Sequence, residues 1–132
     1  MAKPNPTDRK YSKEHEWALA HGDGMATVGI TDYAQDMLTD IVFVELPPVG
    51  KKVEQTAPLA VVESVKSVSD VYAPVGGEVI AVNLALENQP ALINQDAFGE
   101  GWIVKLKMDN PAQLDGLLDP AAYDTLIQEE KH

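Results

Sequence analysis

The 132-residue sequence contains no cysteine, which excludes disulfide bonds, cysteine-ligated zinc and catalysis by a thiolate. Only three histidines are present, and no recognisable ligand spacing joins His15 and His21 to carboxylates, so we expect no metal site. No apolar run approaches the ~18 residues that a membrane-spanning helix requires. Disulfide-stabilised, metal-centred and membrane-spanning functions are therefore not expected.

Positive charge is also scarce. Ten Lys and Arg stand against twenty-one Asp and Glu, giving a formal net charge of −11. Such a chain repels phosphate backbones and anionic headgroups, so neither nucleic acids nor membranes are expected partners. The first residues lack the apolar core of a secretory signal. The sequence therefore predicts a cytoplasmic, bacterial-type protein whose partners are other proteins.

The length and the ordinary hydrophobic content of 45% favour one folded domain. We expect a single domain over residues 1–132, with a core at about 11–108 and a helical segment at 110–130. We expect the protein to be a monomer.

Frequent Gly and Pro divide the first hundred residues into short apolar runs typical of strands. These runs are rich in β-branched and aromatic residues. The predicted strands are Met25–Ile30, Ile41–Leu46, Pro58–Val65, Ser67–Tyr72, Glu78–Val82 and Trp102–Met108. The predicted fold is mostly β, a flattened sandwich or barrel of two sheets.

Three helices are predicted beside these strands. The first covers Thr31 to Leu38, where Asp32 and Gln35 have the spacing of a capping box. Two more follow near the C-terminus, each opened by a capping residue and a proline, at Asn110-Pro111 and Asp119-Pro120. Their leucines, with Tyr123 and Ile127, form apolar stripes that are expected to dock on the protein's own core.

Lys66 is the centre of the most informative segment. It lies in the run Glu63-Ser64-Val65-Lys66-Ser67, between two β-favouring arms of similar length, which predicts a lysine at the tip of a hairpin. Pro74 to Val79 then supplies a turn and a strand, which is expected to pair beneath the hairpin. An isolated turn lysine is usually only an exposed residue, so the significance of Lys66 depends on these flanking segments.

Strand, protruding lysine, strand and proline-glycine turn together resemble the biotinyl and lipoyl carrier domains. The resemblance implies that the two sheets form a flattened sandwich or barrel of the biotinyl/lipoyl type. Further segments resemble one family more closely, the H protein of the glycine cleavage system. The matching segments are Tyr11 to Trp17 (YSKEHEW), Val28 to Asp36 (VGITDYAQD), Val42 to Pro47 (VFVELP), Glu63 to Ser67 (ESVKS), Leu92 to Asn94 (LIN) and Gly99 to Trp102 (GEGW). Tyr123, in a terminal helix, continues the resemblance, which covers most of the chain.

The resemblance implies that Lys66 carries lipoic acid as an amide and that the protein has no catalytic residues of its own. It would be a shared substrate of partner enzymes. A glycine decarboxylase, the P protein, would load an aminomethyl group from glycine. An aminomethyltransferase, the T protein, would pass it to tetrahydrofolate and release ammonia, and dihydrolipoyl dehydrogenase, the L protein, would reoxidise the arm. A lipoate-attaching enzyme would modify Lys66.

The aminomethyl cargo carries a cationic amine that a carboxylate-lined surface cleft could shelter from water. Glu16 and Asp70 are the candidate cleft residues, since both fall at positions that match the family. The chain departs from the family pattern at Met37, where some members carry histidine, and at Gly76, where serine is commoner. Neither departure affects acylation of Lys66.

Four alternatives remain open from the sequence. A biotin carrier is disfavoured because Val65 and Ser67, rather than methionines, flank Lys66. A lipoyl domain from a 2-oxoacid dehydrogenase would lack the C-terminal helices. An enzyme using His15 and Glu16 as a proton-transfer pair has no nucleophile or cofactor loop to support it. An H-like carrier that relays lipoyl groups to other proteins would use the same lysine.

Overall fold

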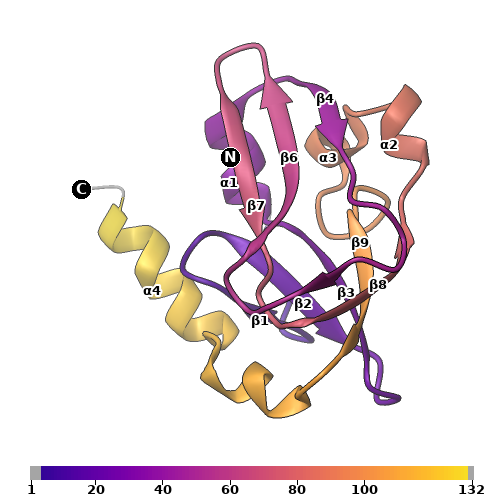
Figure 1. Ribbon diagram of the computed structural model, residues 1–132. Helices are drawn as coiled ribbons and strands as arrows, with labels where there is room; N and C mark the ends of the chain where they lie inside the picture. Colours follow the sequence, from indigo (N-terminus) through magenta and orange to yellow (C-terminus); the bar gives the residue numbers. More distant parts are fainter. Residues whose placement is uncertain (1–3, 131–132) are drawn as a thin grey trace.

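The computed structural model describes residues 4–130, and its strands form two antiparallel sheets (Figure 1). The larger sheet has the strand order β1-β2-β3-β9-β8-β5, and the smaller has the order β4-β6-β7. The strands are β1 Lys10–Tyr11, β2 Glu16–Ala20, β3 Met25–Ile30, β4 Ile41–Glu45, β5 Lys52–Val53, β6 Pro58–Ser64, β7 Val68–Tyr72, β8 Gly77–Val82 and β9 Val104–Met108. The predicted mostly-β fold of two sheets is confirmed, and the sheets do not close into a barrel.

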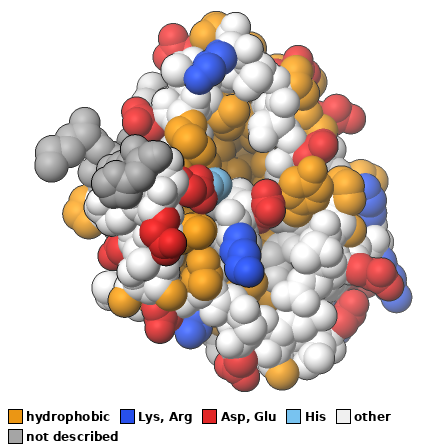
Figure 2. Space-filling view, turned by 90° about the vertical axis from the view of Figure 1, so that its left-hand side faces the viewer, with side chains coloured by type: hydrophobic (Ala, Val, Ile, Leu, Met, Phe, Trp, Pro, Cys, Tyr) orange, Lys and Arg blue, Asp and Glu red, His pale blue; other side chains and the backbone are white. Residues whose placement is uncertain are grey.

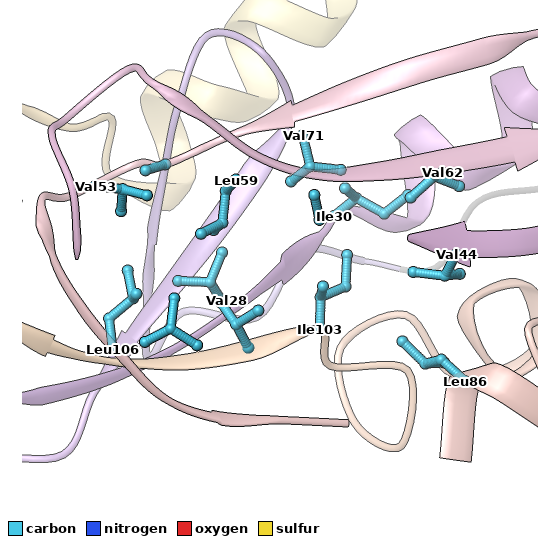
Figure 3. Packing of buried hydrophobic residues seen from close by; sticks show 14 of the residues in the cluster. Val28, Ile30, Val44, Val53, Leu59, Val62, Val71, Leu86, Ile103 and Leu106 are labelled. Atoms are coloured by element: carbon cyan, nitrogen blue, oxygen red, sulfur yellow. The ribbon is translucent and has the colours of Figure 1, made fainter. Parts of the chain in front are cut away.

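The core lies between the two sheets. Figure 3 shows Val28 and Leu106 of the larger sheet facing Leu59 and Val71 of the smaller one. On β7 and β9, buried side chains alternate with exposed or half-buried ones, as expected for strands with one face in the core. Strand β3 is buried on both faces. Burial of this apolar surface is the main source of stability and holds the smaller sheet against the larger.

All six predicted strands exist, with ends that differ by up to two residues. The last begins at Val104 rather than Trp102, because the buried Asn83 side chain binds the carbonyl groups of Glu100 and Trp102, each at 2.8 Å. The strand after Pro74 is not paired beneath the hairpin. It is β8, which pairs with β9 and β5 in the other sheet, so that expectation was wrong.

The first predicted helix is present as α1, Asp32–Leu38, but its cap is Thr31 and not Asp32. The Thr31 hydroxyl accepts the amide of Ala34 at 3.1 Å, while Gln35 binds the Asp32 side chain instead. Thr31 precedes the helix with extended backbone, the geometry that an N-cap needs. The predicted capping box was therefore placed one residue too late.

Of the two predicted C-terminal helices, the first is a short 3₁₀ helix, Pro111–Gly116, capped by Asn110. The second is α4, Pro120–Glu130, whose start is capped by the Asp119 carboxylate. Two single-turn helices were not predicted, α2 Ala85–Asn88 and α3 Leu92–Gln95. Four residues are too few to show a helical hydrophobic period, so these two helices could not be predicted from the sequence pattern.

Helix α4 is fixed to the sheet by an aromatic and polar contact. Tyr123 is fully buried and stacks on Tyr11 with ring centroids 4.6 Å apart. Its hydroxyl shares hydrogen bonds with the Thr31 hydroxyl at 2.7 Å and with His15 Nδ1 at 2.9 Å. The apolar stripe of this helix thus docks on the protein's own core, as predicted.

Candidate functional site

Lys66 lies at the tip of the β6–β7 hairpin, between Ser64, the last residue of β6, and Val68, the first of β7. Its side chain is exposed, and so are those of Val65 and Ser67. The hairpin projects from the molecule at the top of Figure 1. The predicted position of Lys66 at a hairpin tip is confirmed, and its amine is open to another protein.

Ser64 fixes the backbone at this tip. Its hydroxyl oxygen accepts the amides of Lys66 at 3.1 Å and Ser67 at 3.0 Å, and its own amide donates to the Ser67 carbonyl at 2.8 Å. A serine hydroxyl that binds nearby backbone amides stabilises a tight turn. The lysine side chain can therefore move while its Cα keeps its place.

The hairpin tip also contacts the segment around the end of α1. The Val65 amide donates to the Asp40 carbonyl at 3.0 Å, and Lys66 Nζ donates to the Met37 carbonyl at 3.3 Å. The Met37 contact uses a backbone oxygen on an exposed helix end, where a cation is mildly favoured. Such a bond is weak enough to be exchanged for water or a new partner.

Glu16 is a buried carboxyl group at the start of β2, with 2% of its surface exposed. It accepts hydrogen bonds from the Ser12 hydroxyl and from the Tyr72 amide, the latter at 3.2 Å. Burial raises the pKa of Glu16 to about 7, because its two hydrogen bonds do not offset the loss of water around the charged form. Near neutral pH this carboxyl group can gain or lose a proton readily.

Glu16 lines a cleft of about 530 Å³ on the protein surface. The walls of the cleft also include Ser12, Gln55, Thr56, Tyr72 and Leu117. The walls contain both polar side chains and apolar ones such as Leu117, so the cleft suits a small group with an apolar body and a polar or cationic end.

The cleft and Lys66 lie at opposite ends of β7. This strand is at the edge of the smaller sheet, and the Tyr72 amide bound by Glu16 belongs to it. At ~3.3 Å per residue, the strand separates Lys66 from Tyr72 by roughly 20 Å. Figure 2 views this side of the molecule and shows apolar side chains in a hollow with acidic side chains around it. An extended group attached to Lys66 would have to lie along this side of the molecule to reach Glu16, and the surface here is hollowed.

Asp70, the second predicted cleft residue, is exposed in the middle of β7 and is not among the residues that line the cleft. It lies between Lys66 and Tyr72 along the strand. Its part in sheltering a cargo stays a prediction.

His15 and Glu16 are adjacent in sequence but bind different partners. His15 has a positive φ of 70° and contacts Tyr123, while its Nε2 lies 3.1 Å from Glu130 Oε1. Glu16 is bound by Ser12 and Tyr72. His15 therefore joins α4 to the loop before β2, and the geometry gives no support to a proton-transfer pair.

Sequence reasoning missed the residues that complete the site. Ser64 was quoted as part of a motif but not as the brace of the turn, although a serine two residues before an exposed turn residue is a usable signal. Ser12 lies four residues before Glu16 and binds it locally. Gln55 and Thr56 both belong to the loop between β5 and β6. These two residues reach the cleft only through tertiary packing, so no local pattern could have identified them.

Comparison with known proteins agrees with this geometry. A sequence model of the family described as Glycine cleavage H-protein matches residues 9–130. The chain belongs to the glycine cleavage H-protein family. Glycine cleavage system H proteins of Symbiobacterium thermophilum and Thermus thermophilus are each 58% identical to it, over 94% and 95% of this chain and 96% and 97% of theirs.

Structure comparison gives the same family. The crystal structure of a glycine cleavage system H protein from Mycobacterium marinum superposes with a TM-score of 0.86 at 37% identity, covering 94% of this chain and 99% of that one. The fold is therefore that of an H protein. Among residues 4–130, no helix has the length and apolar character to cross a membrane.

Proposed function

We propose that this H-protein family member is the lipoyl carrier of a glycine cleavage system, with lipoate joined by an amide to Lys66. The observation that supports this most directly is an exposed lysine, held at the tip of a braced hairpin, in the sequence Glu63-Ser64-Val65-Lys66-Ser67. In this proposal the protein is not an enzyme. It is a shared substrate of other enzymes.

The residues around Lys66 fit an acylated lysine. The amine is exposed, and among residues 4–130 its hydrogen-bond partner is the Met37 carbonyl, to which an amide N–H can also donate. Acylation removes the charge of an exposed group, so it leaves no buried charge unpaired. When bound, the lipoyl group supplies the redox-active sulfur atoms that a chain without cysteine does not have.

The partners proposed are a glycine decarboxylase (P protein), an aminomethyltransferase (T protein), dihydrolipoyl dehydrogenase (L protein) and a lipoate-attaching enzyme. The hairpin presents Lys66 outward on a fixed base, which lets one tethered group reach several active sites in turn. Action in the bacterial cytoplasm as a monomer is part of the same proposal.

We further propose that the cleft shelters the aminomethyl cargo between enzymes, with Glu16 facing its amine. The ionised Glu16 carboxylate would pair with the cationic amine of the cargo. The nearby positive charge would lower the pKa of Glu16 and so favour its ionised form. Ser12 and the Tyr72 amide hold the Glu16 carboxyl group in place. Asp70, exposed along the way on β7, is the proposed second acidic contact.

Mass spectrometry tests the carrier role. The protein from a lipoate-competent bacterial host is digested, and the peptide containing Lys66 is searched for added mass. A lipoyl-sized addition on Lys66, lost in Lys66→Arg but kept in Lys51→Arg, is the expected result. A biotin-sized mass would indicate the biotin carrier instead. An unmodified Lys66, with no glycine-dependent loading by P protein after chemical lipoylation, would refute the proposal.

Glu16→Gln tests the cleft in the lipoylated protein. The variant should be loaded by P protein at the wild-type rate, but its aminomethyl group should be released as ammonia and formaldehyde faster in the absence of T protein. Equal release rates in the two proteins would remove Glu16 from the proposal and leave lipoylation of Lys66 untouched.

A further inference from the structure

The outward face of the smaller sheet carries two rows of side chains close to the hairpin tip. Register places Phe43 of β4 opposite Glu63 of β6, and Glu63 opposite Val68 of β7. The next outward row along the strands is Glu45, Val61 and Asp70. Residues directly opposite each other share a face of the sheet, so these six side chains form one surface, the Phe43 face.

A strand irregularity creates the apolar part of this face. The pairing of β4 with β6 shifts between Ile41 and Phe43, which turns both Val42 and Phe43 outward. Their exposed fractions are 53% and 49%. Bulges of this kind redirect side chains and are common next to functional sites. Phe43 is thus exposed to water and lies opposite Glu63, which precedes Lys66 by three residues.

The Phe43 face combines exposed apolar groups with acids and contains no Lys or Arg among its six residues. Val68 is 66% exposed, and Val65 at the adjoining tip is 68% exposed. Apolar side chains gathered on a surface and bordered by charge are typical of protein-binding sites. Glu45, Glu63 and Asp70 would match a partner with basic residues around an apolar recess.

The face is joined rigidly to Lys66. Val62 and Val71, on the opposite side of the same strands, are buried in the core. The Val65 amide is bound to the Asp40 carbonyl, in the connection between α1 and β4. An enzyme that docks on Phe43 would therefore find the lysine at a fixed place.

We propose that the Phe43 face is the surface by which the enzyme that acylates Lys66 recognises this protein. The inference rests on the proposed function and extends it to a recognition surface outside the lysine hairpin. The acylating enzyme must bring its active site to Nζ, within one lysine side chain of the tip, so its surface has to cover the adjoining residues. The partner should present an apolar recess for Phe43 and Val68, flanked by Lys or Arg.

The reaction used as readout is acyl transfer. The neutral Lys66 amine attacks the carbonyl carbon of lipoyl adenylate, the C–N bond forms, the C–O bond to AMP breaks, and AMP leaves as the nitrogen loses a proton. No oxidant or reductant is needed.

The experiment compares acylation of purified full-length variants by a lipoate–protein ligase supplied with lipoyl adenylate. Phe43→Ser should raise KM roughly tenfold with kcat little changed, because a central apolar anchor is lost while the lysine is untouched. Val49→Ser and Leu84→Ser are matched controls, since these apolar residues are 62% and 64% exposed elsewhere on the protein. Both should keep the wild-type KM, and thermal unfolding should show that all variants are folded.

Charge is tested in the same assay. Glu45→Lys should raise KM, and the wild-type KM should rise with added NaCl more steeply than that of Glu45→Gln. If Phe43→Ser and Glu45→Lys are acylated as well as wild type, the recognition surface is refuted while lipoylation of Lys66 stands. If the wild-type protein itself is not acylated at Lys66, both proposals fall.

Discussion

At the scale of single residues, Glu16 combines burial with a titration near neutral pH. It is a buried carboxyl group whose two hydrogen-bond donors, Ser12 and the Tyr72 amide, are neutral. The loss of hydration in the folded state dominates and raises its pKa from 4.5 to about 7. Burial therefore makes the folded state more stable when Glu16 is protonated than when it is ionised.

The sign of the pH effect follows from proton binding. Between pH 4.5 and about 7, the folded protein holds a proton on Glu16 that the unfolded chain has lost. The free energy of unfolding should therefore decrease as pH rises through this range, by up to about 3 kcal/mol from this group alone. Below pH 4.5 this contribution is fully present, and above about 7 it is lost.

Glu16→Gln should remove that pH dependence, because a glutamine can accept from Tyr72 and donate to Ser12 without titrating. Urea unfolding at pH 5 and pH 8 measures it. The difference in stability between wild type and variant should shift in favour of the variant at the higher pH. A constant difference at both pH values would contradict the raised pKa.

At the scale of elements, backbone contacts decide details that local sequence does not show. The Thr31 cap displaces the predicted Asp32 cap because Thr31 has the extended backbone at the helix start. The shift of register in β4 exposes two consecutive apolar residues, which strict alternation would not allow. Strand β8 belongs to the larger sheet, although a short connection joins it to β7 of the hairpin in the smaller sheet.

Gly77 shows how tightly β8 is packed against β9. A Cβ at this position would collide with the Lys107 carbonyl oxygen and lie 2.9 Å from the carbonyl carbon. Both groups belong to backbone and cannot turn aside. Gly77→Ala should therefore lower the free energy of unfolding by about 2 kcal/mol through displacement of one strand.

Gly116→Ala is the matched control, since a Cβ there would meet nothing within 4 Å. It should change stability by no more than about 0.5 kcal/mol. Urea unfolding with circular dichroism compares the two variants. Equal stability of Gly77→Ala and Gly116→Ala would show that β8 can shift without cost.

At the scale of the whole molecule, the net charge of −11 acts against compactness. Arg9 pairs with Asp8, but ten Lys and Arg cannot neutralise twenty-one Asp and Glu. Screening this repulsion should stabilise the fold. Raising NaCl from low to physiological concentration should raise the unfolding temperature by about 3–5 °C, measured by calorimetry at pH 8. An unchanged or lower temperature would mean that repulsion is not a significant cost.

The sequence by itself determined the place of six of the nine strands found within residues 4–130, Lys66 at a hairpin tip, and the family; it did not predict β1, β2 and β5. These features depend on local signals: alternating β-branched residues, turn residues and short motifs in a fixed order. Glu16 and Asp70 could be named only by resemblance, because nothing local marks a carboxylate as buried or exposed. The tertiary structure decided that Glu16 is buried beside Ser12 and Tyr72, that Asp70 stays exposed, and that a shifted register turns Phe43 outward. Ser12 is a local neighbour of Glu16, but Tyr72 reaches it from 56 residues away, and the register of Phe43 is set by the pairing of β4 with β6. Contacts between segments distant in the sequence form only in the folded chain, so local signals do not contain them.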